Sequence, residues 1–445
     1  MMKPRAAANS PTPLPEKAGV VILGAGLTGL IAARELVRAG RRDVLLLESA
    51  PRPGGLMKTN RSGGVTIDEL PHVFFTKNRR AARIFRGLCG PASAHAHRLG
   101  VLWKGGWVDF PFQDNIHQLS PEDRRRVLVS LLENRAGCAA APRNLEEYAL
   151  RELGAGITDL FFRPYNEKLW QTPLAGMSYA WLAAKIRLPG PAGLAESILG
   201  NRPSRRGDVA PHAKFIYPKA GGMEGVIENL LRAVAPVSPV CGTEVTGIDA
   251  RRKTVLTSRG PVRYNSLIST LPLGKAAALA GLKDCRRALP RLRATRVLCL
   301  HYTLSGVNLP PYHWIYVPDP ALPFYRLTRA ELFNPRAVPG GKALLVECAL
   351  PGDSPAAPAG LQARVTAALL RLGIVRRKDI RGVRAYDHCP AYPVPHTRHL
   401  EDTGTCLRSL AAAGVISAGR FGEWAVYNMD HSIEAGLAAA KKILK

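Results

Sequence analysis

An apolar run at residues 19–23 is followed by closely spaced glycines and then by a segment whose apolar residues recur at helical spacing. The run continues as GVVILGAGLTG to residue 29, and the next segment, LIAARELVRAG, ends at Gly40. A second apolar run, DVLLLE, closes on Glu48. The order of these periodicities predicts a strand, an amphipathic helix and a second strand, which form a β-α-β unit at the start of the chain.

Helical periodicity returns in the middle of the chain, and alternating periodicity follows it. Residues 121–135, 144–154 and 177–186 have apolar positions at helical spacing, so residues 121–200 are predicted to be mostly helical. The segment VLWKGGWVDF is predicted to be a hairpin around its glycine pair. Alternation in TRVLCLHYTLSG, YHWIYVP and KALLVECAL predicts a further sheet. Residues 200–213, rich in Pro, Gly and Arg, are predicted to form a mobile loop.

The glycines after the first strand have the spacing G-x-G-x-x-G. Gly24 makes a tight turn, Gly26 lets the backbone approach a pyrophosphate, and Gly29 allows close packing of helix on strand. The N-terminus of the helix adds free N–H groups and a positive dipole end for the phosphates. Glu48 can accept a hydrogen bond from a ribose hydroxyl. Such a motif alone is weak evidence, but its complete β-α-β context predicts a dinucleotide-binding site.

A second glycine pair and the C-terminal segment favour FAD as that dinucleotide. Gly54 and Gly55, in SAPRPGGLMKT, stand where FAD enzymes bring the backbone against the flavin side of the cofactor, and a nicotinamide-only enzyme would not need them. Residues 413–439 run as strand, glycine turn, loop and helix, and we expect the last helix to begin at the flavin ring. Asp430 and Ser432 at its start also suit capping. The predicted cofactor-binding residues are Gly24, Gly26, Leu27, Thr28, Gly29, Glu48, Gly54, Gly55, Leu56, Val245, Gly419, Arg420, Asn428, Met429 and Ser432.

The composition is that of a globular enzyme. The chain has 445 residues, 46% of them hydrophobic and 22% charged, which indicates two or three intertwined domains. No apolar run reaches the roughly 18 residues of a membrane span, and residues 1–17 are predicted to be a disordered tail without the apolar core of a secretion signal. The cysteines have no C-x-x-C and no zinc-like spacing, so no metal site is predicted. We expect a soluble cytoplasmic protein.

The net charge of +28 favours anionic partners, namely a nucleotide, a nucleic acid or a membrane face. The basic residues are spread along a chain that is rich in Ala, Arg, Gly and Pro, so a compositional origin carries more weight. No arginine-rich arm or aromatic-interleaved module is present, and we therefore predict no nucleic-acid partner. An anionic small-molecule substrate is compatible with this charge, and the oligomeric state is left open.

Several separated motifs together resemble one family. In chain order they are GGLMKTNRSGGVTIDELPHVFF, WVDFPFQDNI, GITDLFFRPYNEKLWQTP, MSYAWLAAKI, FIYPKAGGMEG, IYVPDPALPFYR, AYPVP and GRFGEWAVYNMDHS. From residue 18 to residue 445 the chain resembles UDP-galactopyranose mutase, more in its eukaryotic branch than in the common bacterial one. Protoporphyrinogen oxidases and amine oxidases of the same FAD superfamily are similar in the FAD motifs but not, as a rule, in WVDFPFQDN or PFYR. The expected fold class is α/β, a Rossmann-type FAD-binding domain with a helical insertion and a mixed or antiparallel substrate-domain sheet.

The resemblance implies an isomerisation without net redox change. In the family, N5 of the reduced flavin attacks the anomeric carbon of the sugar and the nucleoside diphosphate leaves. The ring then opens and recloses as a furanose, and the diphosphate returns. The flavin must stay reduced, which implies NADPH or NADH as the reductant. Covalent catalysis by the cofactor would explain why the sequence shows no catalytic triad and no carboxylate pair.

The resemblance places the family's functional residues on positions of this chain. His72, in DELPHVFF, matches a histidine that packs against the flavin and tunes N5, although alone it would be interpreted as a satisfied buried histidine. Arg326, in PFYR, matches an arginine that grips the diphosphate, and a planar guanidinium suits bidentate binding. Tyr316 and Tyr392 match tyrosines around the diphosphate, and Arg98 resembles an arginine near the sugar and its phosphate. The uridine-binding wall falls on Phe112, Gln113, Phe161, Asn166 and Trp170.

Four positions depart from the family's pattern. Lys185, a predicted catalytic residue with His72 and Arg326, stands where the family has a second diphosphate arginine, and lysine lacks the bidentate fork. Phe110 replaces a tyrosine, and His212 stands where an asparagine contacts the sugar. The loop before MDHS is two residues shorter than in the eukaryotic form of the family. Tyr427 would serve in place of the phosphate-binding tyrosine that this loop carries in the family. These exchanges weaken the prediction of UDP-galactose more than that of a mutase, because a site built around particular hydroxyls discriminates between sugars.

The segment FFRPYNEKLWQTP, residues 161–173, is predicted to be a helix end and a turn that line the nucleotide pocket. Trp170 and Phe161 would offer flat apolar surfaces to a uracil ring, and Asn166 would read the base edge. Pro164 would fix the bend that brings them to one side. The pair Glu167–Lys168 is expected to face solvent or a neighbouring helix, and no chemistry is assigned to it.

The expected domain order interleaves three parts, and two alternative functions remain open. After a tail (1–17), the three parts are an FAD-binding domain (18–100, 216–275 and 401–445), a hairpin and helical insertion with the nucleotide wall (101–215), and a substrate-domain sheet (276–400). One alternative is an FAD-dependent oxidase or dehydrogenase acting on a nucleotide sugar, a sugar-like compound or an amine. The other is a flavin-bearing partner protein whose site has drifted. Arg326 and Tyr316 favour a nucleoside diphosphate ligand, whereas Lys185 most favours the alternatives.

Overall fold

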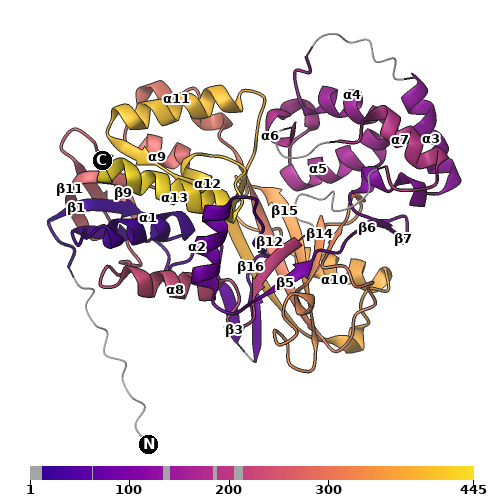
Figure 1. The fold of residues 1–445 in the computed structure, drawn as a ribbon, viewed down its shortest axis with the longest axis horizontal. Helices are drawn as coiled ribbons and strands as arrows, with labels where there is room; N and C mark the ends of the chain where they lie inside the picture. Colours follow the sequence, from indigo (N-terminus) through magenta and orange to yellow (C-terminus); the bar gives the residue numbers. More distant parts are fainter. Residues whose placement is uncertain (1–12, 63, 134–140, 184–187, 205–213) are drawn as a thin grey trace, which may run out of the picture.

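The β-α-β unit predicted at the start of the chain lies at the edge of a sheet built from distant parts of the sequence (Figure 1). The computed structural model describes residues 13–62, 64–133, 141–183, 188–204 and 214–445. Within them, this sheet, called the nucleotide sheet below, has the order β2-β1-β11-β10-β9, with β17 beside β11. Its strand β1 runs parallel to both β2 and β11. Its strands are β1 (Lys17–Leu23), β2 (Val44–Leu47), β9 (Val245–Asp249), β10 (Thr254–Thr257), β11 (Gly260–Ser269) and β17 (Val415–Ser417).

Helices cover both faces of the nucleotide sheet, because successive residues of its central strands point to opposite sides. The helices are α1 (Leu27–Arg38), α2 (Arg79–Cys89), α8 (Glu224–Val234), α9 (Leu273–Leu279), α11 (His399–Ala412), α12 (Gly419–Gly422) and α13 (Met429–Leu444). On β1, Val20 and Ile22 are buried in a core shared with α1, α8 and α13. Val21 and Leu23 are buried in a second core with α9 and α11. The alternation along one strand therefore gives the sandwich of helix, sheet and helix.

A second, mostly antiparallel sheet lies beside the first and is called the substrate sheet below. Its order is β16-β12-β15-β14-β13-β6-β7, and β13 runs parallel to β6. Its described strands are β6 (Leu99–Trp103), β7 (Gly106–Asp109), β12 (Ala294–Leu304), β13 (Trp314–Tyr316), β14 (Arg326–Arg329), β15 (Lys342–Pro351) and β16 (Ile380–Pro393). The predicted hairpin is β6 and β7, and it extends this sheet through β13. One face packs against α10 (Leu361–Arg371), and the other packs on Ile67 and Leu70 toward the centre of the molecule.

The helical insertion forms a separate lobe at the upper right of Figure 1. Its described helices are α3 (Pro121–Glu133), α4 (Leu145–Ile157), α5 (Arg163–Trp170), α6 (Ala180–Ala183) and α7 (Gly190–Leu199). The helices α3 and α4 match two of the three predicted segments, and α6 forms residues 180–183 of the third, whose described part is 177–183. A π-helical turn at Thr158–Phe162 joins α4 to α5. Pro164 is the second residue of α5 and directly follows the junction with this π-helical turn.

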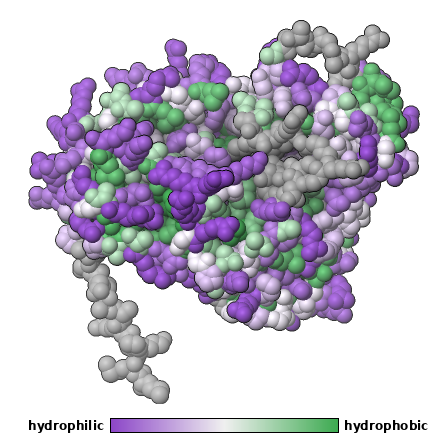
Figure 2. Space-filling model, viewed as in Figure 1, coloured by the Kyte–Doolittle hydropathy of each residue, from purple (hydrophilic) through white to green (hydrophobic). Residues whose placement is uncertain are grey.

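Two short ribbons and the molecular surface complete the fold. The ribbons are β3 (Thr59–Ser62) with β4 (Val65–Asp68), and β5 (Ala92–Ala96) with β8 (Lys214–Pro218). In Figure 2, hydrophilic side chains cover most of the visible face, and hydrophobic ones gather at the outer end of the helical insertion. Val129 and Leu132 of α3, in that insertion, are exposed. No helix in the described part of the chain is long and apolar enough to cross a membrane.

Candidate active site

A cavity of about 580 Å³ lies where the nucleotide sheet, the helical insertion and the substrate sheet meet. Its walls come from the glycine loop after β1, the segment that leads into α13, the helix α5 and the paired strands β13 and β14. The volume lies within the roughly 300–1,000 Å³ that is usual for small-molecule sites. Three parts of the fold that are distant in sequence therefore share one binding space.

The glycine loop forms a backbone cradle at one end of the cavity. Gly24 has φ +101°, a conformation that favours glycine. A Cβ on Gly29 would lie 2.0 Å from the carbonyl oxygen of Gly24, so only glycine lets α1 start this close to the turn. A Cβ on Gly55, which has φ +58°, would lie 3.3 Å from Cα of Gly26, so the two glycine loops meet backbone to backbone. This narrow cradle fits the pyrophosphate of a dinucleotide, since side chains there would fill it.

Glu48 marks the outer edge of the same cradle. It follows β2, and its carboxylate oxygens accept hydrogen bonds from the backbone N–H groups of Ala25 and Ala50, each at 2.8 Å. These two donors hold the carboxylate at the cavity wall, where its remaining lone pairs can accept from a ribose hydroxyl. Val245, the first residue of β9, lines the same end.

The C-terminal segment faces the cradle across the cavity. Gly419 has φ +86°, and a Cβ on it would lie 2.5 Å from Oγ1 of Thr28, so α12 passes directly over the start of α1. The Thr28 hydroxyl donates to the carbonyl oxygen of Ser432 at 3.1 Å, which ties α1 to the first turn of α13. Asp430 turns away from the cavity lining and accepts from the Thr76 hydroxyl at 2.7 Å. The N-terminus of α13 is thus held against the cavity by contacts with two other segments.

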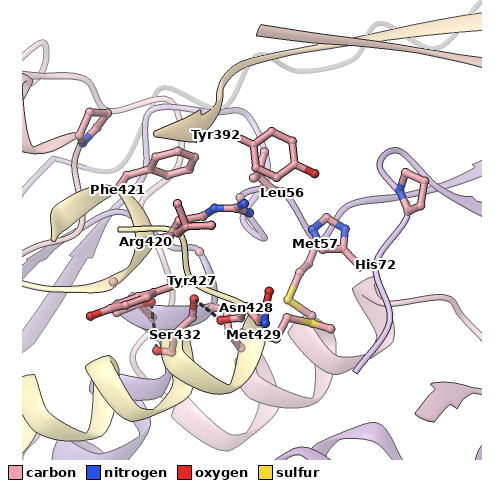
Figure 3. A pocket seen from close by; sticks show the side chains of 18 of the residues that line it. Leu56, Met57, His72, Tyr392, Arg420, Phe421, Tyr427, Asn428, Met429 and Ser432 are labelled. Carbon is pink, nitrogen blue, oxygen red and sulfur yellow. Dashed lines mark hydrogen bonds between the residues drawn. The ribbon is translucent and has the colours of Figure 1, made fainter. Parts of the chain in front are cut away.

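His72 lies in the cavity wall opposite the C-terminal segment. Figure 3 shows it next to Met57, with Arg420 extending toward it and Tyr392 nearby. Its Nδ1 lies 2.9 Å from the carbonyl oxygen of Leu70, and because a carbonyl can only accept, Nδ1 carries the proton. Burial lowers the pKa of His72 to about 4, and the positive charge of Arg420 adds to this effect. At neutral pH His72 is therefore uncharged, with its lone pair on Nε2.

Arg420 and Tyr392 form a second feature of this end. The Arg420 guanidinium lies over the Tyr392 ring, 4.6 Å from its centroid, as in a cation–π contact. Burial lowers the pKa of Arg420, although the arginine stays charged because its ordinary pKa is so high. The site thus places one positive charge and one neutral imidazole on the two sides of the same space.

Arg326 lies on β14, close enough to Tyr392 for the two side chains to interact electrostatically, and its guanidinium is directed at a carboxylate that the sequence did not reveal. Nε and Nη2 of Arg326 donate to the two oxygens of Glu347 at 2.5 and 2.7 Å, and the Tyr325 hydroxyl also donates to Glu347 at 2.8 Å. The Arg326 guanidinium lies 4.5 Å from the centroid of the Trp314 ring. Burial lowers the pKa of Arg326, but the Glu347 carboxylate more than offsets this and the pKa is raised.

Only one edge of the Arg326 guanidinium is occupied. Nε and Nη2 face Glu347, whose side chain is fully buried, and the Nη1–H groups with the second Nη2–H form the edge that is left for a bidentate phosphate contact. Removing a carboxylate from water costs several kcal/mol, and the arginine and tyrosine donors compensate that cost. What Arg326 presents to the cavity is its remaining N–H groups and its charge.

Aromatic rings enclose the space next to Arg326. Tyr316, which pairs with Arg326 across β13 and β14, has its ring 4.4 Å from that of Phe110 and 5.4 Å from the edge-on ring of Tyr165. Burial raises the pKa of Tyr316, so its hydroxyl keeps its proton and can donate. Phe110, which stands where the resembled family has a tyrosine, contributes a ring without a hydroxyl to this wall.

The helix α5 and the π-helical turn before it supply the apolar wall. Phe161 stacks on Phe112 with ring centroids 4.6 Å apart, and Trp170 meets the ring of Trp181 edge-on at 5.1 Å. The amide Nδ2 of Asn166 donates to the carbonyl oxygen of Phe162 at 2.7 Å. That bond orients the Asn166 side chain from within its own helix, and Oδ1 is the group left to meet a donor.

Most of the predicted residues line this one cavity, but a few do not. Phe112 is fully buried behind Phe161, and Gly29 packs under the turn, so neither reaches the cavity. Arg98 is exposed in the connection between β5 and β6, where its backbone pairs with His313, and the structure does not bring it to the cavity. Lys185 and His212 lie outside the described residues. The predicted residues in the lining are Gly24, Gly26, Leu27, Thr28, Glu48, Gly54, Gly55, Leu56, His72, Phe110, Gln113, Phe161, Asn166, Trp170, Val245, Tyr316, Arg326, Tyr392, Gly419, Arg420, Tyr427, Asn428, Met429 and Ser432.

One lining residue already has a hydrogen-bond partner, and one assignment near the cavity needs correction. The Tyr427 hydroxyl donates to the Glu423 carboxylate, so it is already engaged within its own loop. Lys168 does not face solvent or another helix. Its ammonium donates to backbone carbonyl oxygens of the loop between β13 and β14. No pattern of side chains indicates this contact, because its partners are backbone groups that lie about 150 positions away.

Several lining residues were not predicted from the sequence. Tyr165 and Trp181 lie within quoted motifs, where their aromatic character was the available signal. Trp314 lies two residues before Tyr316 on β13, so alternation along that strand could have suggested it, whereas Tyr325 ends the loop directly before β14 and its aromatic character was the only signal. Glu347, on the neighbouring strand, has no signal apart from a charged residue inside the apolar segment KALLVECAL.

Comparison with known proteins bears on this geometry. Residues 27–444 match the family described as flavin containing amine oxidoreductase. The chain belongs to this family. The family is flavin-containing, which supports FAD as the cofactor of the glycine cradle, and it confirms the α/β fold class. These family members are enzymes of the flavin-dependent oxidoreductase type.

Individual solved structures and curated proteins are also similar to this chain. A crystal structure of reduced UDP-galactopyranose mutase superposes with a TM-score of 0.90 at 28% identity and covers 96% of each chain. A probable UDP-galactopyranose mutase of Klebsiella pneumoniae is 26% identical over 182 residues, which is 38% of this chain and 44% of that protein. Lysine-specific histone demethylase 1 homolog 1 of Arabidopsis thaliana is 39% identical over 88 residues, 19% of this chain and 10% of that protein. The aligned part is thus less than half the length of either curated relative.

Proposed function

We propose that the protein is an FAD-dependent mutase that interconverts the pyranose and furanose forms of a nucleotide sugar, UDP-galactose or a related nucleoside diphosphate sugar. The observation that carries the proposal is the shared cavity. The residues expected to hold a nucleoside diphosphate, Tyr316, Arg326 and Trp170, line the same space as the glycine cradle. The similarity to reduced UDP-galactopyranose mutase over nearly the whole chain supports it.

FAD, when bound and reduced, would supply a nucleophilic ring nitrogen, N5, to the anomeric carbon of the sugar. NADPH or NADH is the proposed reductant. The glycine cradle and Glu48 would hold the dinucleotide, and the start of α13 would face its ring system. His72 would present an unprotonated Nε2 at the flavin, because its Nδ1 proton is held by Leu70.

The chain's own residues would stabilise the departing diphosphate. Arg326 supplies a permanent positive charge that Glu347 orients, and the Tyr316 hydroxyl adds a neutral donor beside it. Electrostatic stabilisation of this kind acts strongly because the walls are apolar and exclude water. The aromatic wall of α5 would bind the uracil ring, so that the nucleotide remains bound while the sugar rearranges.

The proposal is tested by incubating the purified holoprotein with UDP-galactofuranose under anaerobic conditions, before and after reduction by dithionite. A mutase converts UDP-galactofuranose to UDP-galactopyranose only when its flavin is reduced, and chromatography separates the two sugars. Activity that needs oxidised flavin and yields an oxidised sugar would overturn the proposal.

A second candidate function is an oxidase or dehydrogenase that removes a hydride from an amine or a sugar. The observation that favours it is the family itself, which is described as an amine oxidoreductase. Substrate-dependent bleaching of the oxidised flavin in the absence of oxygen would identify this activity. Under the mutase proposal, UDP-sugars leave the oxidised flavin spectrum unbleached.

A further inference from the structure

Lys168 forms a contact that nothing in the proposed chemistry uses. Its Nζ donates to the carbonyl oxygens of Val317 at 2.9 Å and Phe324 at 3.2 Å, and to that of Asp319. An ammonium has three hydrogens, and here three carbonyl acceptors converge on it. The side chain therefore closes the loop between β13 and β14, residues 317–325, from the side of α5.

The two ends of this loop carry the residues expected at the diphosphate. Val317 directly follows Tyr316, and Phe324 is separated from Arg326 by a single residue. The backbone N–H of Val317 also donates to the carbonyl oxygen of Tyr325 at 2.9 Å, so the loop ends are paired. A shift of this loop would move Tyr316 and Arg326 together.

The other side of the contact carries the expected nucleotide wall. Lys168 is part of α5, as are the cavity residues Tyr165, Asn166 and Trp170. The helix α5 also packs on β15, the strand that holds Glu347. One side chain thus joins the helical insertion to the substrate sheet at the point where both border the cavity.

We propose that Lys168 is a positioning residue, which fixes the spacing between the aromatic wall of α5 and the Tyr316–Arg326 pair and thereby sets the affinity for a nucleoside diphosphate. This inference rests on the proposed function. The physical reason is that a ligand in contact with both sides must stop their relative motion when it binds, and this loss of conformational entropy lowers the affinity. When the wall of α5 and Arg326 are already held at the correct distance, this entropy loss is smaller.

The charges around Lys168 make its protonation relevant to this role. Burial lowers the pKa of Lys168 to about 8, while Asp319 on the loop and Cys348 on β15 act in the opposite direction. Burial raises the pKa of Cys348 to about 12, so that thiol stays neutral. On α5 itself, Arg163 and Glu167 are engaged with other groups. As pH rises through about 8, Lys168 becomes an amine with two hydrogens for three acceptors, and the loop loosens.

The test measures UDP binding by calorimetry with the wild-type holoprotein and with Lys168→Met and Lys168→Arg. Lys104→Met is the matched control, because Lys104 also ties two segments together, through Asp123, but away from the cavity. We expect Lys168→Met to weaken UDP binding about tenfold or more, whereas Lys168→Arg and Lys104→Met stay within about threefold of wild type. Between pH 7.5 and 9.5, wild-type affinity should fall and that of Lys168→Arg should stay level.

A second readout does not depend on the ligand. Hydrogen exchange at the amide of Val317 should be faster in Lys168→Met than in wild type, and unchanged in Lys104→Met. Wild-type protein that binds no UDP would sink the proposed function and this inference with it. Wild-type protein that binds UDP, together with a Lys168→Met variant of equal affinity, would overturn the inference alone. If Lys168→Met does not fold, a Lys168→Arg variant whose affinity still falls with pH as in wild type overturns it equally.

Discussion

The two ends of the cavity are built in different ways. The end at the glycine cradle, called the nucleotide end below because it fits the cofactor dinucleotide, is built from backbone. Its glycines are close together in sequence, and its carboxylate, Glu48, is held by nearby N–H groups. The substrate end relies on side chains that meet across the fold, Arg326 with Glu347 and Lys168 with the loop after β13. An added Cβ in a backbone cradle blocks the ligand, whereas removal of one partner from a buried charge network destabilises the fold. The predictions below test this contrast.

The largest effect is expected at the cradle. In Gly29→Ala the new Cβ would meet the carbonyl oxygen of Gly24 at 2.0 Å, and backbone cannot move aside as a flexible side chain does. We expect this variant to be purified without flavin. The matched control is Gly87→Ala on α2, where a Cβ has no heavy atom within 4 Å and should leave flavin content unchanged. The flavin absorbance of the purified proteins decides, and a yellow Gly29→Ala protein would contradict the account of this end.

The next effect concerns the buried ion pair. Glu347→Gln removes the charge that compensates Arg326 and should lower the free energy of unfolding by about 3–5 kcal/mol. The control is Asp43→Asn, which removes the partner of Arg41 in a pair that is much more exposed, where about 0–1 kcal/mol is expected. Urea denaturation of both variants measures the difference. Equal losses in the two would mean that burial adds nothing to the Arg326–Glu347 pair.

Acid should act on the substrate sheet through its buried histidines. Burial lowers the pKa of His313 to about 4, so the folded form stays neutral where the unfolded form, with an ordinary pKa of about 6.5, takes up a proton. Stability is therefore lost as pH falls from about 6.5 toward 4. For one such group the loss between pH 7 and pH 5 is about 2 kcal/mol. His313→Asn should reduce the pH dependence of urea denaturation by that amount, and an unchanged slope would argue against a neutral His313.

The smallest effect is expected from a single hydroxyl. Phe110→Tyr adds a polar group next to Tyr316, whose ring lies 4.4 Å away. One additional hydrogen bond to a bound diphosphate is worth about 0.5–1.5 kcal/mol, which is roughly a tenfold change in UDP affinity at most. Calorimetry with UDP measures it. A much larger change would show that Phe110 determines specificity and does not only form part of the wall.

The nucleotide end could be predicted from the sequence because its determinants are local. Gly24, Gly26 and Gly29 have fixed spacing within one β-α-β unit, and each is required by backbone geometry that repeats wherever the unit occurs. The alternation that predicted β12, β13 and β15 is local in the same sense. Here the structure follows the expectations closely.

The substrate end could be predicted only in part. The resemblance named Arg326, but not that Glu347 on the next strand engages its Nε and Nη2 edge, because pairing between strands is a property of register. It named Trp170 and Asn166, but Lys168 between them was left without a role, since its acceptors are backbone carbonyls that no side-chain pattern reports. Arg98 shows the converse: a matched position that the fold leaves exposed. Local pattern gives elements and motifs, whereas long-range pairing gives the geometry of the site.

One measurement tests the central claim most directly, namely the number of sugar turnovers per reduced flavin. The holoprotein is reduced with one equivalent of dithionite per flavin under strict anaerobiosis, excess UDP-galactofuranose is added, and product and flavin spectrum are followed together. The account predicts many molecules of UDP-galactopyranose per flavin while the flavin stays reduced. Oxidation of one flavin for each sugar converted, or no conversion at all, would contradict it.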